Sequence, residues 1–360
     1  MTSVTTYFQF MNKVLTVLLV FFLSCLSLLF IIYIGRKPVS SEFIRLFPPH
    51  AAGIVRVFEL PTSDLYLAGV SSTQVFLGSY SNLDELYALP CLGDSIPKPS
   101  NLQRIPIVRK SNQPISVGTR IAVDSPRFHL LDAIWANVYV GEFGKSDLTS
   151  HSLLDRSFSR ALPISRTTYI LMAFDSVSQS NSLLKLNIDS AVNCPRFILE
   201  KQLDGQFCTQ GSLSYDASTH TLLFTYRYRN RTLSLDTNLR QLYRSKTIDP
   251  VDSVQLQLDT LLTDGISKVT FKAPPLVVNN LTAASYPYYY VQSAIRAANE
   301  DVQLASDHSV IDVYDIVTGD YISSFYLPDF DGVSFSDFRV HDNMLVAIYR
   351  KRLFVFKLRH

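Results

Sequence analysis

Charged side chains of both signs lie close together in two short segments, and they are the residues best suited to bind a polar ligand. Asp124 and Arg127 follow a run of hydrophobic residues, while Asp337 and Arg339 alternate with hydrophobic ones. Carboxylates and guanidiniums bind polar groups through charge-assisted hydrogen bonds. They also pair with one another and with water. A ligand-binding role and a purely structural role are therefore both open for these four residues.

Two acidic stretches bring carboxylates together in a way that calcium sites also do. They are Asp329-Phe-Asp331-Gly332 and Asp249-Pro-Val-Asp252. Neither supplies the full set of oxygen ligands that a calcium loop provides. Asp and Gly also form turns without any ion. We therefore expect turns between strands here, and we predict no metal site.

The sequence lacks the motifs of covalent and phosphate-cradling chemistry. No Gly-x-Ser-x-Gly string marks a nucleophilic serine, and no glycine-rich phosphate loop occurs. The histidines are scattered without HxxxH or HxH spacing, so only the fold could gather them at a metal. We predict no catalytic residue, and the sequence identifies no cofactor.

The local pattern around the charged segments is that of strands and turns. Short windows rich in Val, Ile, Leu, Tyr, Phe and Thr end at Gly, Asn, Asp, Ser or Pro. One unit, made of a strand, a polar turn and a second strand, recurs six times. Its copies are Leu65–Gly69 with Gln74–Gly78, Phe128–Asp132 with Asn137–Glu142, Tyr169–Asp175 with Ser182–Ile188, Thr221–Tyr226 with Arg231–Asp236, Tyr288–Ser293 with Val310–Tyr314, and Met344–Tyr349 with Arg352–Leu358.

The spacing of these hairpins predicts an all-β, six-bladed β-propeller. A β-sandwich or two stacked β-domains would also contain many short strands, but six similar hairpins favour the propeller. The innermost strand of each blade then lines a central channel. Thr119–Asp124, running on to Arg127, and Ser336–Arg339 are candidate inner strands. This would place all four charged residues near the axis.

The two ends of the propeller are expected to pair with each other. Ser334–Val340 opens a last unit, and the chain ends after only three strands of it, at Leu358. A spare strand, Ile54–Leu60, precedes the first hairpin. We predict that this strand is the outermost one of the last blade, because such pairing removes exposed sheet edges.

An apolar run from Val14 to Ile34 predicts a transmembrane helix ahead of the propeller. Its length matches the roughly 30 Å hydrocarbon core of a bilayer. A cleaved signal peptide would have a shorter apolar core followed by small residues, whereas Arg36 and Lys37 follow this run. Lipoprotein processing at Cys25 is disfavoured, because the run does not stop there.

The orientation of the anchor follows from two opposing considerations. Lys13 precedes the run, while Arg36, Lys37 and Arg45 follow it, so a literal positive-inside count favours a cytoplasmic C-terminal domain. Long segments are translocated largely regardless of this count. We therefore expect the propeller to be extracytoplasmic, in the periplasm.

The expected domain order is a tail over residues 1–13, a transmembrane helix over 14–34, a proline-containing stalk over 35–50 and the propeller over 51–360. Cys194 and Cys208 could be joined if a hairpin lies between them, and such a cross-link would add roughly 3 kcal/mol of stability. The alternative is that both are reduced thiols, and the sequence leaves the two open.

The composition excludes two broad classes. Lys and Arg number 33 and Asp and Glu 31, giving a formal charge of +2, and 47% of the residues are hydrophobic. A disordered chain would be less hydrophobic or more charged. A nucleic-acid-binding protein needs a clustered excess of Lys and Arg, which does not occur. A folded protein without a nucleic-acid partner is expected.

Four segments resemble a known kind of protein. They are Ser41–His50, Leu65–Gly69 with Val75–Gly78, Ser293–Glu300 and Val310–Leu327. Together they are similar to uncharacterised membrane-anchored, propeller-like proteins of Bacteroidota. The resemblance implies a bacterial cell-envelope protein whose propeller lies outside the cytoplasm, and it implies no activity or catalytic residue.

Two functional hypotheses follow. The first is a non-enzymatic, membrane-tethered propeller that binds an envelope protein or a small polar ligand, because propellers commonly serve as binding platforms. The alternative is a hydrolase or lactonase-like enzyme whose carboxylates hold a calcium ion in the central channel. Stoichiometric bound metal in the purified protein would favour the second hypothesis.

Overall fold

The computed structural model describes residues 16, 18–27, 42–92, 102–107, 115–145, 148–153, 157–190, 195–263 and 266–359. The chain divides into two units, residues 1–40 and 41–360. In the first unit, residues 18–27 form a helix whose large hydrophobic side chains are 48% to 65% exposed. No helix in the described ranges combines the length and hydropathy of a membrane span. Much of the predicted span, residues 14–34, lies outside those ranges.

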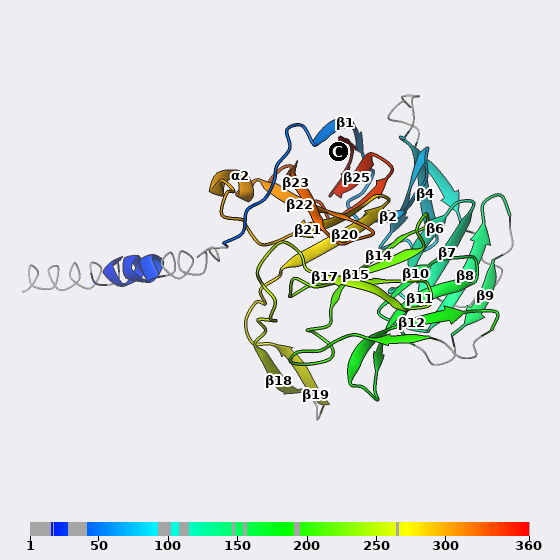
Figure 1. Cartoon of the computed structure of the whole chain (residues 1–360), viewed down its shortest axis with the longest axis horizontal. Helices are drawn as coiled ribbons and strands as arrows, with labels where there is room; N and C mark the ends of the chain where they lie inside the picture. The colour runs from blue at the N-terminus through cyan, green and yellow to red at the C-terminus, as the bar shows by residue number, and fades with distance from the viewer. Residues whose placement is uncertain are drawn as a thin grey trace, which may run out of the picture. The chain divides into compact units, whose positions relative to one another are not determined.

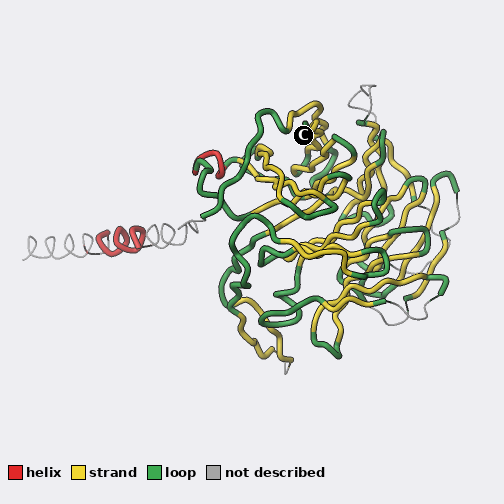
Figure 2. The backbone as a smooth tube through the Cα atoms, in the orientation of Figure 1, coloured by secondary structure: helices red, strands yellow, loops and turns green. Residues whose placement is uncertain are grey.

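The second unit is an all-β, six-bladed propeller, as the hairpins predicted. Six four-stranded antiparallel sheets follow one another around a ring, with β2, β6, β10, β14 and β20 toward its centre (Figure 1). Strand and loop make up nearly all of this unit (Figure 2). In five of the six sheets the first strand in sequence is the innermost strand. In the sixth sheet, which contains β1, the innermost strand is β24 and β1 is the outermost.

The strands of the first three blades are as follows. Blade 1 contains β2 (Leu65–Val70), β3 (Gln74–Ser79), β4 (Glu85–Pro90) and β5 (Gln103–Pro106). Blade 2 contains β6 (Arg120–Asp124), β7 (Arg127–Asp132), β8 (Asn137–Glu142) and β9 (Thr149–Ser152). Blade 3 contains β10 (Arg160–Pro163), β11 (Thr168–Asp175), β12 (Ser180–Asn187) and β13 (Arg196–Ile198).

The remaining three blades complete the ring. Blade 4 contains β14 (Gly211–Asp216), β15 (Thr221–Tyr226), β16 (Thr232–Leu235) and β17 (Gln241–Ser245). Blade 5 contains β20 (Asn279–Ser285), β21 (Tyr288–Ser293), β22 (His308–Asp315) and β23 (Tyr321–Pro328). Blade 6 contains β24 (Asp337–His341), β25 (Met344–Tyr349), β26 (Arg352–Leu358) and β1 (Ala52–Glu59).

The predicted closure of the ring is confirmed. β1 pairs antiparallel with β26, with Val57 opposite Phe354 and Phe58 opposite Leu353. It is the outermost strand of blade 6. The N-terminal strand therefore covers the edge that the C-terminal strand would otherwise expose.

The six hairpins are not all equivalent, which corrects one expectation. Five of them are the second and third strands of their blades, but the Leu65–Gly69 hairpin is the first and second strand of blade 1. The reason is that β2 is buried on both sides. Leu65 and Leu67 pack against blade 6, while Tyr66 and Ala68 pack against blade 2. An inner strand buried in this way has the hydrophobic composition of a middle strand.

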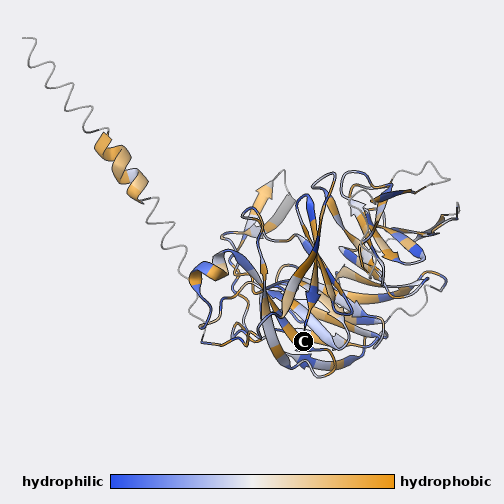
Figure 3. Ribbon diagram, turned by 90° about the horizontal axis from the view of Figure 1, so that it is seen from above, coloured by the Kyte–Doolittle hydropathy of each residue, from blue (hydrophilic) through white to orange (hydrophobic). Residues whose placement is uncertain are grey.

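The core lies between the blades, and this explains the apolar middle strands. Alternate residues of a strand project from opposite faces of a sheet. In β15, Leu222 therefore joins the cluster shared with blade 3, whereas Leu223 joins the cluster shared with blade 5. The same alternation separates Leu130 from Leu131 in β7. The hydropathy colouring shows hydrophobic residues throughout the blades (Figure 3). Each blade is stable because both of its faces are covered by its neighbours.

Two described parts of the second unit lie outside the six blades, a hairpin and a short helix. The hairpin of β18 (Leu258–Thr263) and β19 (Ile266–Phe271) stands apart from the ring in the connection from blade 4 to blade 5 (Figure 1). The short helix α2 (Val302–Ser306) lies between β21 and β22, and the carboxylate of Asp301 accepts hydrogen bonds from its first turn.

The segment before β1 packs along the outside of blade 5. The Ala298 N–H donates to Phe43 O at 2.9 Å, and the Ser324 N–H donates to Leu46 O at 2.7 Å. Phe47 stacks on Tyr326 with ring centroids 4.5 Å apart. The part of the expected stalk that the structure describes, residues 42–50, is thus held against the propeller.

Candidate functional site: the central channel

The two sides of the ring differ in the loops that they carry. On one side the outer strand of each blade leads to the inner strand of the next, through residues such as 60–64, 199–210 and 329–336. We call this side the connection face. The other side carries turns such as the one between β20 and β21, and we call it the opposite face. Inner strands begin at the connection face and end at the opposite face.

A cavity of about 240 Å³ opens where the inner strands begin. Its charged lining side chains are Arg120 from β6, Arg160 from β10, and Asp337 and Arg339 from β24. Asp337 and Arg339 reach the channel because they alternate with Phe338 and Val340, which pack into the core between blades 5 and 6. The structure therefore brings together two of the four residues singled out in the sequence, and it adds two arginines.

Asp124 lies at the other end of the channel. It is the last residue of β6 and lines a cavity of about 290 Å³ at the opposite face, together with Tyr215 and His341. Arg339 lines both cavities, so it stands between the two ends. The two channel carboxylates, Asp124 and Asp337, are therefore at opposite ends. Among the described residues, no three His, Cys, Asp or Glu side chains gather as a metal would require.

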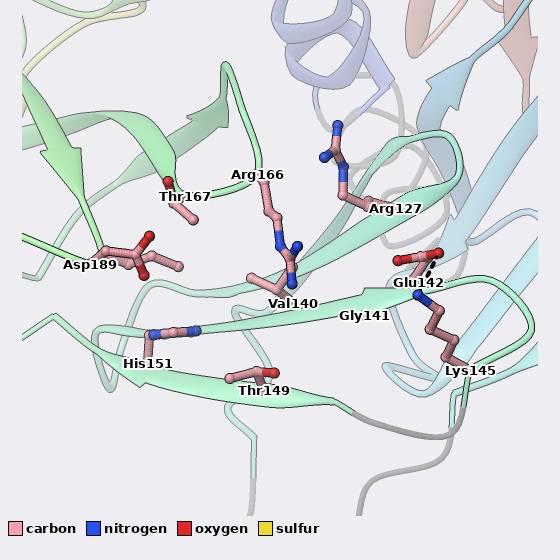
Figure 4. A pocket seen from close by; sticks show the side chains of 11 residues that line it. Arg127, Val140, Gly141, Glu142, Lys145, Thr149, His151, Arg166, Thr167 and Asp189 are labelled. Atoms are coloured by element: carbon pink, nitrogen blue, oxygen red, sulfur yellow. Dashed lines mark ion pairs between the residues drawn. The ribbon is translucent and has the colours of Figure 1, made fainter.

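Arg127 lies away from the channel, contrary to the expectation for it. The chain reverses between β6 and β7, and Arg127 begins the second strand of blade 2. It lines a cavity of about 460 Å³ between blades 2 and 3, near Glu142, Arg166 and Asp189 (Figure 4). Its Nη2 lies 3.2 Å from Asp124 Oδ2. The short spacing of these two residues in the sequence thus makes a local ion pair and does not put both at the axis.

The guanidiniums at the connection-face mouth are incompletely paired. Arg120 Nη1 donates to Thr119 O at 2.8 Å, and its guanidinium lies 4.4 Å from the ring centroid of Tyr80. Within the described ranges, the side chains of Arg160 and Arg339 make no hydrogen bond or ion pair. Asp337 Oδ2 accepts a long hydrogen bond from the Leu67 N–H, at 3.3 Å. The arginines are thus available to another group.

The charged side chains at the mouth lie close enough together to shift one another's pKa values. Water reaches the side chain of Arg160, but the channel walls displace part of its hydration, which lowers its pKa; Arg227 and Arg339 nearby lower it further. Burial raises the pKa of Asp337, and Arg339 and Arg160 act in the opposite direction. The cavity lining holds three guanidiniums against one carboxylate. It is an environment that favours negative charge.

The two acidic stretches form turns. Asp249 is buried and accepts hydrogen bonds from the Thr247 hydroxyl at 2.6 Å and the Val251 N–H at 3.0 Å. Asp331 pairs with Arg352 at 3.1 Å. These partners are those of Asx turns and surface ion pairs. Cys208 is a buried free thiol, and Cys194 lies outside the described residues.

Sequence reasoning missed Arg160 and Tyr80. β10 is only four residues long and contains a proline, so its pattern is too short to identify a strand. Tyr80 follows β3 directly, and its N–H donates to Asp64 O at 2.9 Å, which places it beside the start of β2. The one usable signal for Arg120 was its place at the start of a predicted inner strand.

The propeller is similar to solved structures of low sequence identity. A member of the DUF4221 family from Bacteroides vulgatus superposes with a TM-score of 0.52 at 10% identity, covering 87% of this chain and 99% of that one. A protein from Bacteroides fragilis, described as exported, gives a TM-score of 0.48 at 11% identity, covering 89% and 99%. No protein-family model matches the sequence. No curated protein matches it either. The first likeness supports the propeller fold and concerns the fold alone.

Proposed function

We propose that this protein is a membrane-tethered binding protein of the cell envelope, and that it binds its ligand or partner at the connection-face mouth of the channel without catalysing a reaction. Residues 14–34 would anchor it, and the propeller over 51–360 would lie in the periplasm. Asp337 and Arg339 belong to the binding site in this proposal. Asp124 and Arg127 contribute to the opposite mouth and to the pocket between blades 2 and 3.

One observation carries the binding role. An open cavity at the centre of the ring is lined by Arg160 and Arg339, whose guanidiniums have no partner among the described residues. Both side chains are exposed, so their charge is hydrated and their N–H donors are accessible from the open cavity. Groups left unpaired in an accessible cavity are suited to an external ligand.

The anchor is supported by the N-terminal helix. Leu18–Leu23 are consecutive large hydrophobic residues, each at least 58% exposed, so they surround the helix on all sides. A helix that is hydrophobic all round is buried in a core or in a membrane. Separating membranes from soluble material tests this: the full chain should sediment with membranes after an alkaline wash, and residues 42–360 should not.

Photo-crosslinking in intact cells of the source bacterium tests the binding role. A photo-reactive phenylalanine analogue replaces either Tyr80 or Tyr286 in the full chain. The two tyrosines are 50% and 55% exposed, and they lie at the connection face and at the opposite face, respectively. They form a matched pair in which only the location differs.

The expected result is a covalent adduct from position 80 that mass spectrometry detects, with no adduct from position 286. Arg339→Ala in the position-80 protein should reduce the yield of adduct, because that guanidinium lines the mouth. The proposal fails if neither position gives an adduct, or if position 286 gives as much as position 80.

A further inference from the structure

We propose that the connection-face mouth of the channel is a site for an oxyanion, a phosphate- or carboxylate-bearing group held by Arg160 and Arg339 with help from Arg120. This inference rests on the proposed binding function and adds the chemical class of the ligand.

The balance of charge at the mouth selects the sign of the ligand. Three guanidiniums and one carboxylate line a single cavity of about 240 Å³. Arg227, in the turn after β15, adds its field to that of the mouth, since it acts on Arg160. A cation such as calcium requires several carboxylate or carbonyl oxygens and would be repelled here. An anion would be attracted.

The geometry of the arginines suits recognition by hydrogen bonds as well as by charge. A guanidinium presents five N–H donors, and its fork matches the oxygens of carboxylate and phosphate. Arg160 uses none of these donors within the described residues, and neither does Arg339. They stand on β10 and β24, which are separated around the ring by the inner strands β2 and β6. Donors would therefore reach one ligand from two sides of the cavity.

Arg120 is already held in position. Its Nη1 donates to Thr119 O at 2.8 Å, and its guanidinium lies over the ring of Tyr80 at 4.4 Å from the centroid. Nη1 also donates weakly to Val117 O at 3.4 Å, and Nε and Nη2 make no hydrogen bond within the described parts of the chain. A side chain fixed before binding loses little conformational entropy when a ligand arrives. Arg120 is thus held in place by its own contacts before a ligand binds, beside the two arginines whose donors are unused.

Asp337 allows a test in which a substitution should strengthen, and not weaken, the binding of an oxyanion. Its carboxylate lines the cavity and would repel a bound oxyanion. Asp337→Asn removes that repulsion and keeps an oxygen that can accept the hydrogen bond from Leu67. A gain of affinity in this variant cannot be produced by misfolding, whereas a loss in an arginine variant could be.

Isothermal titration calorimetry on the full chain in non-ionic detergent measures the effect, with inorganic phosphate and citrate as probes. Arg160→Gln and Arg339→Gln should each weaken binding at least tenfold, and Asp337→Asn should strengthen it at least threefold. Arg240→Gln is the matched control, since Arg240 is an exposed arginine at the opposite face. It should bind within twofold of the wild-type protein.

A second arm distinguishes a soluble anion from a lipid headgroup. The chain contains one tryptophan, Trp135, which is 47% exposed in the connection-face turn between β7 and β8. If phosphate and citrate do not bind but Trp135 emission shifts to shorter wavelength in phosphatidylglycerol nanodiscs relative to phosphatidylcholine nanodiscs, the headgroup is the source. That shift should also disappear in Arg160→Gln.

The oxyanion assignment is overturned if no response occurs in either arm, or if the two arginine variants behave like Arg240→Gln, or if Asp337→Asn weakens binding. Should the position-80 adduct still form in that case, binding at the mouth stands and only the ligand class is wrong. Should the adduct also be missing, the proposed function itself fails.

Discussion

Arg45 and Asp312 form a buried ion pair with two parallel contacts, Nε to Oδ1 at 2.7 Å and Nη2 to Oδ2 at 2.9 Å. Both side chains are at most 1% exposed. Arg45 also pairs with Glu300 and donates to Ile295 O at 2.9 Å. This ion pair joins the segment before β1 to the third strand of blade 5, and the two carboxylates raise the pKa of the arginine further above its ordinary value against the effect of burial.

Replacing Arg45 by methionine should lower the free energy of unfolding by about 3–5 kcal/mol. The reason is that Asp312 and Glu300 would remain buried without their cation, and breaking one partner of a buried pair costs this much. Chemical denaturation of residues 42–360 measures the change. Arg240→Met, at an exposed site, should change stability by less than about 0.5 kcal/mol. Equal stability of the two variants would show that the buried pair is not formed.

Removing β1 should convert the propeller into a self-associating protein. Residues 61–360 lack the strand that covers β26, so the Leu353–Leu358 edge would be open to pairing with another chain. Size-exclusion chromatography should show residues 42–360 as a monomer and residues 61–360 as oligomers or aggregates. A monomeric, thermally stable 61–360 fragment would mean that the ring closes without this strand.

Stability should fall in mild acid because of His129. This side chain is fully buried, and its Nδ1 lies 2.7 Å from the Tyr169 hydroxyl. Burial lowers its pKa to about 4, while the unfolded value is about 6.5. The folded state therefore binds fewer protons between these values. The stabilising contribution is fully present above about pH 6.5 and is lost as the pH falls through the folded pKa.

The loss should be on the order of 3 kcal/mol between pH 7 and pH 4. His129→Gln should remove this part of the pH dependence, measured as unfolding free energy against pH. His220→Gln, at an exposed site, should keep the wild-type slope. If His129→Gln and the wild type have parallel curves, His129 does not titrate differently in the two states.

Gly69→Ala should destabilise the ring by about 1–3 kcal/mol, the range for overpacking. A Cβ at Gly69 would lie 2.5 Å from Val123 O on the neighbouring inner strand, so β2 and β6 would have to separate. At Gly53, in β1, an added Cβ meets nothing within 4 Å. Gly53→Ala is the control and should be close to neutral in thermal unfolding. Similar melting temperatures for both variants would contradict the close approach of the inner strands.

Most of the fold could be predicted because its signals are local. A hairpin such as Met344–Tyr349 with Arg352–Leu358 needs only a few adjacent residues, hydrophobic in the strands and polar in the turn. Ring closure through β1 could also be predicted, because the last unit contained only three strands and Ile54–Leu60 was a spare strand, so pairing the two removed exposed edges. The sequence pattern did not distinguish the inner strand β2 from a middle strand. Both faces of β2 are buried, so its residues are as hydrophobic as those of a middle strand.

From the sequence alone, the propeller and its closure could be predicted, and so could the alternation that places Asp337 and Arg339 on one face of β24. Which residues meet at the mouth depends on how the blades pack around the ring. Arg160 lines the same cavity as Arg339 because the ring places blade 3 opposite blade 6. Arg127 does not line that cavity, because the turn after β6 carries the chain into the second strand of blade 2. Local patterns set the direction of a side chain, but its neighbours depend on contacts between residues far apart in the chain.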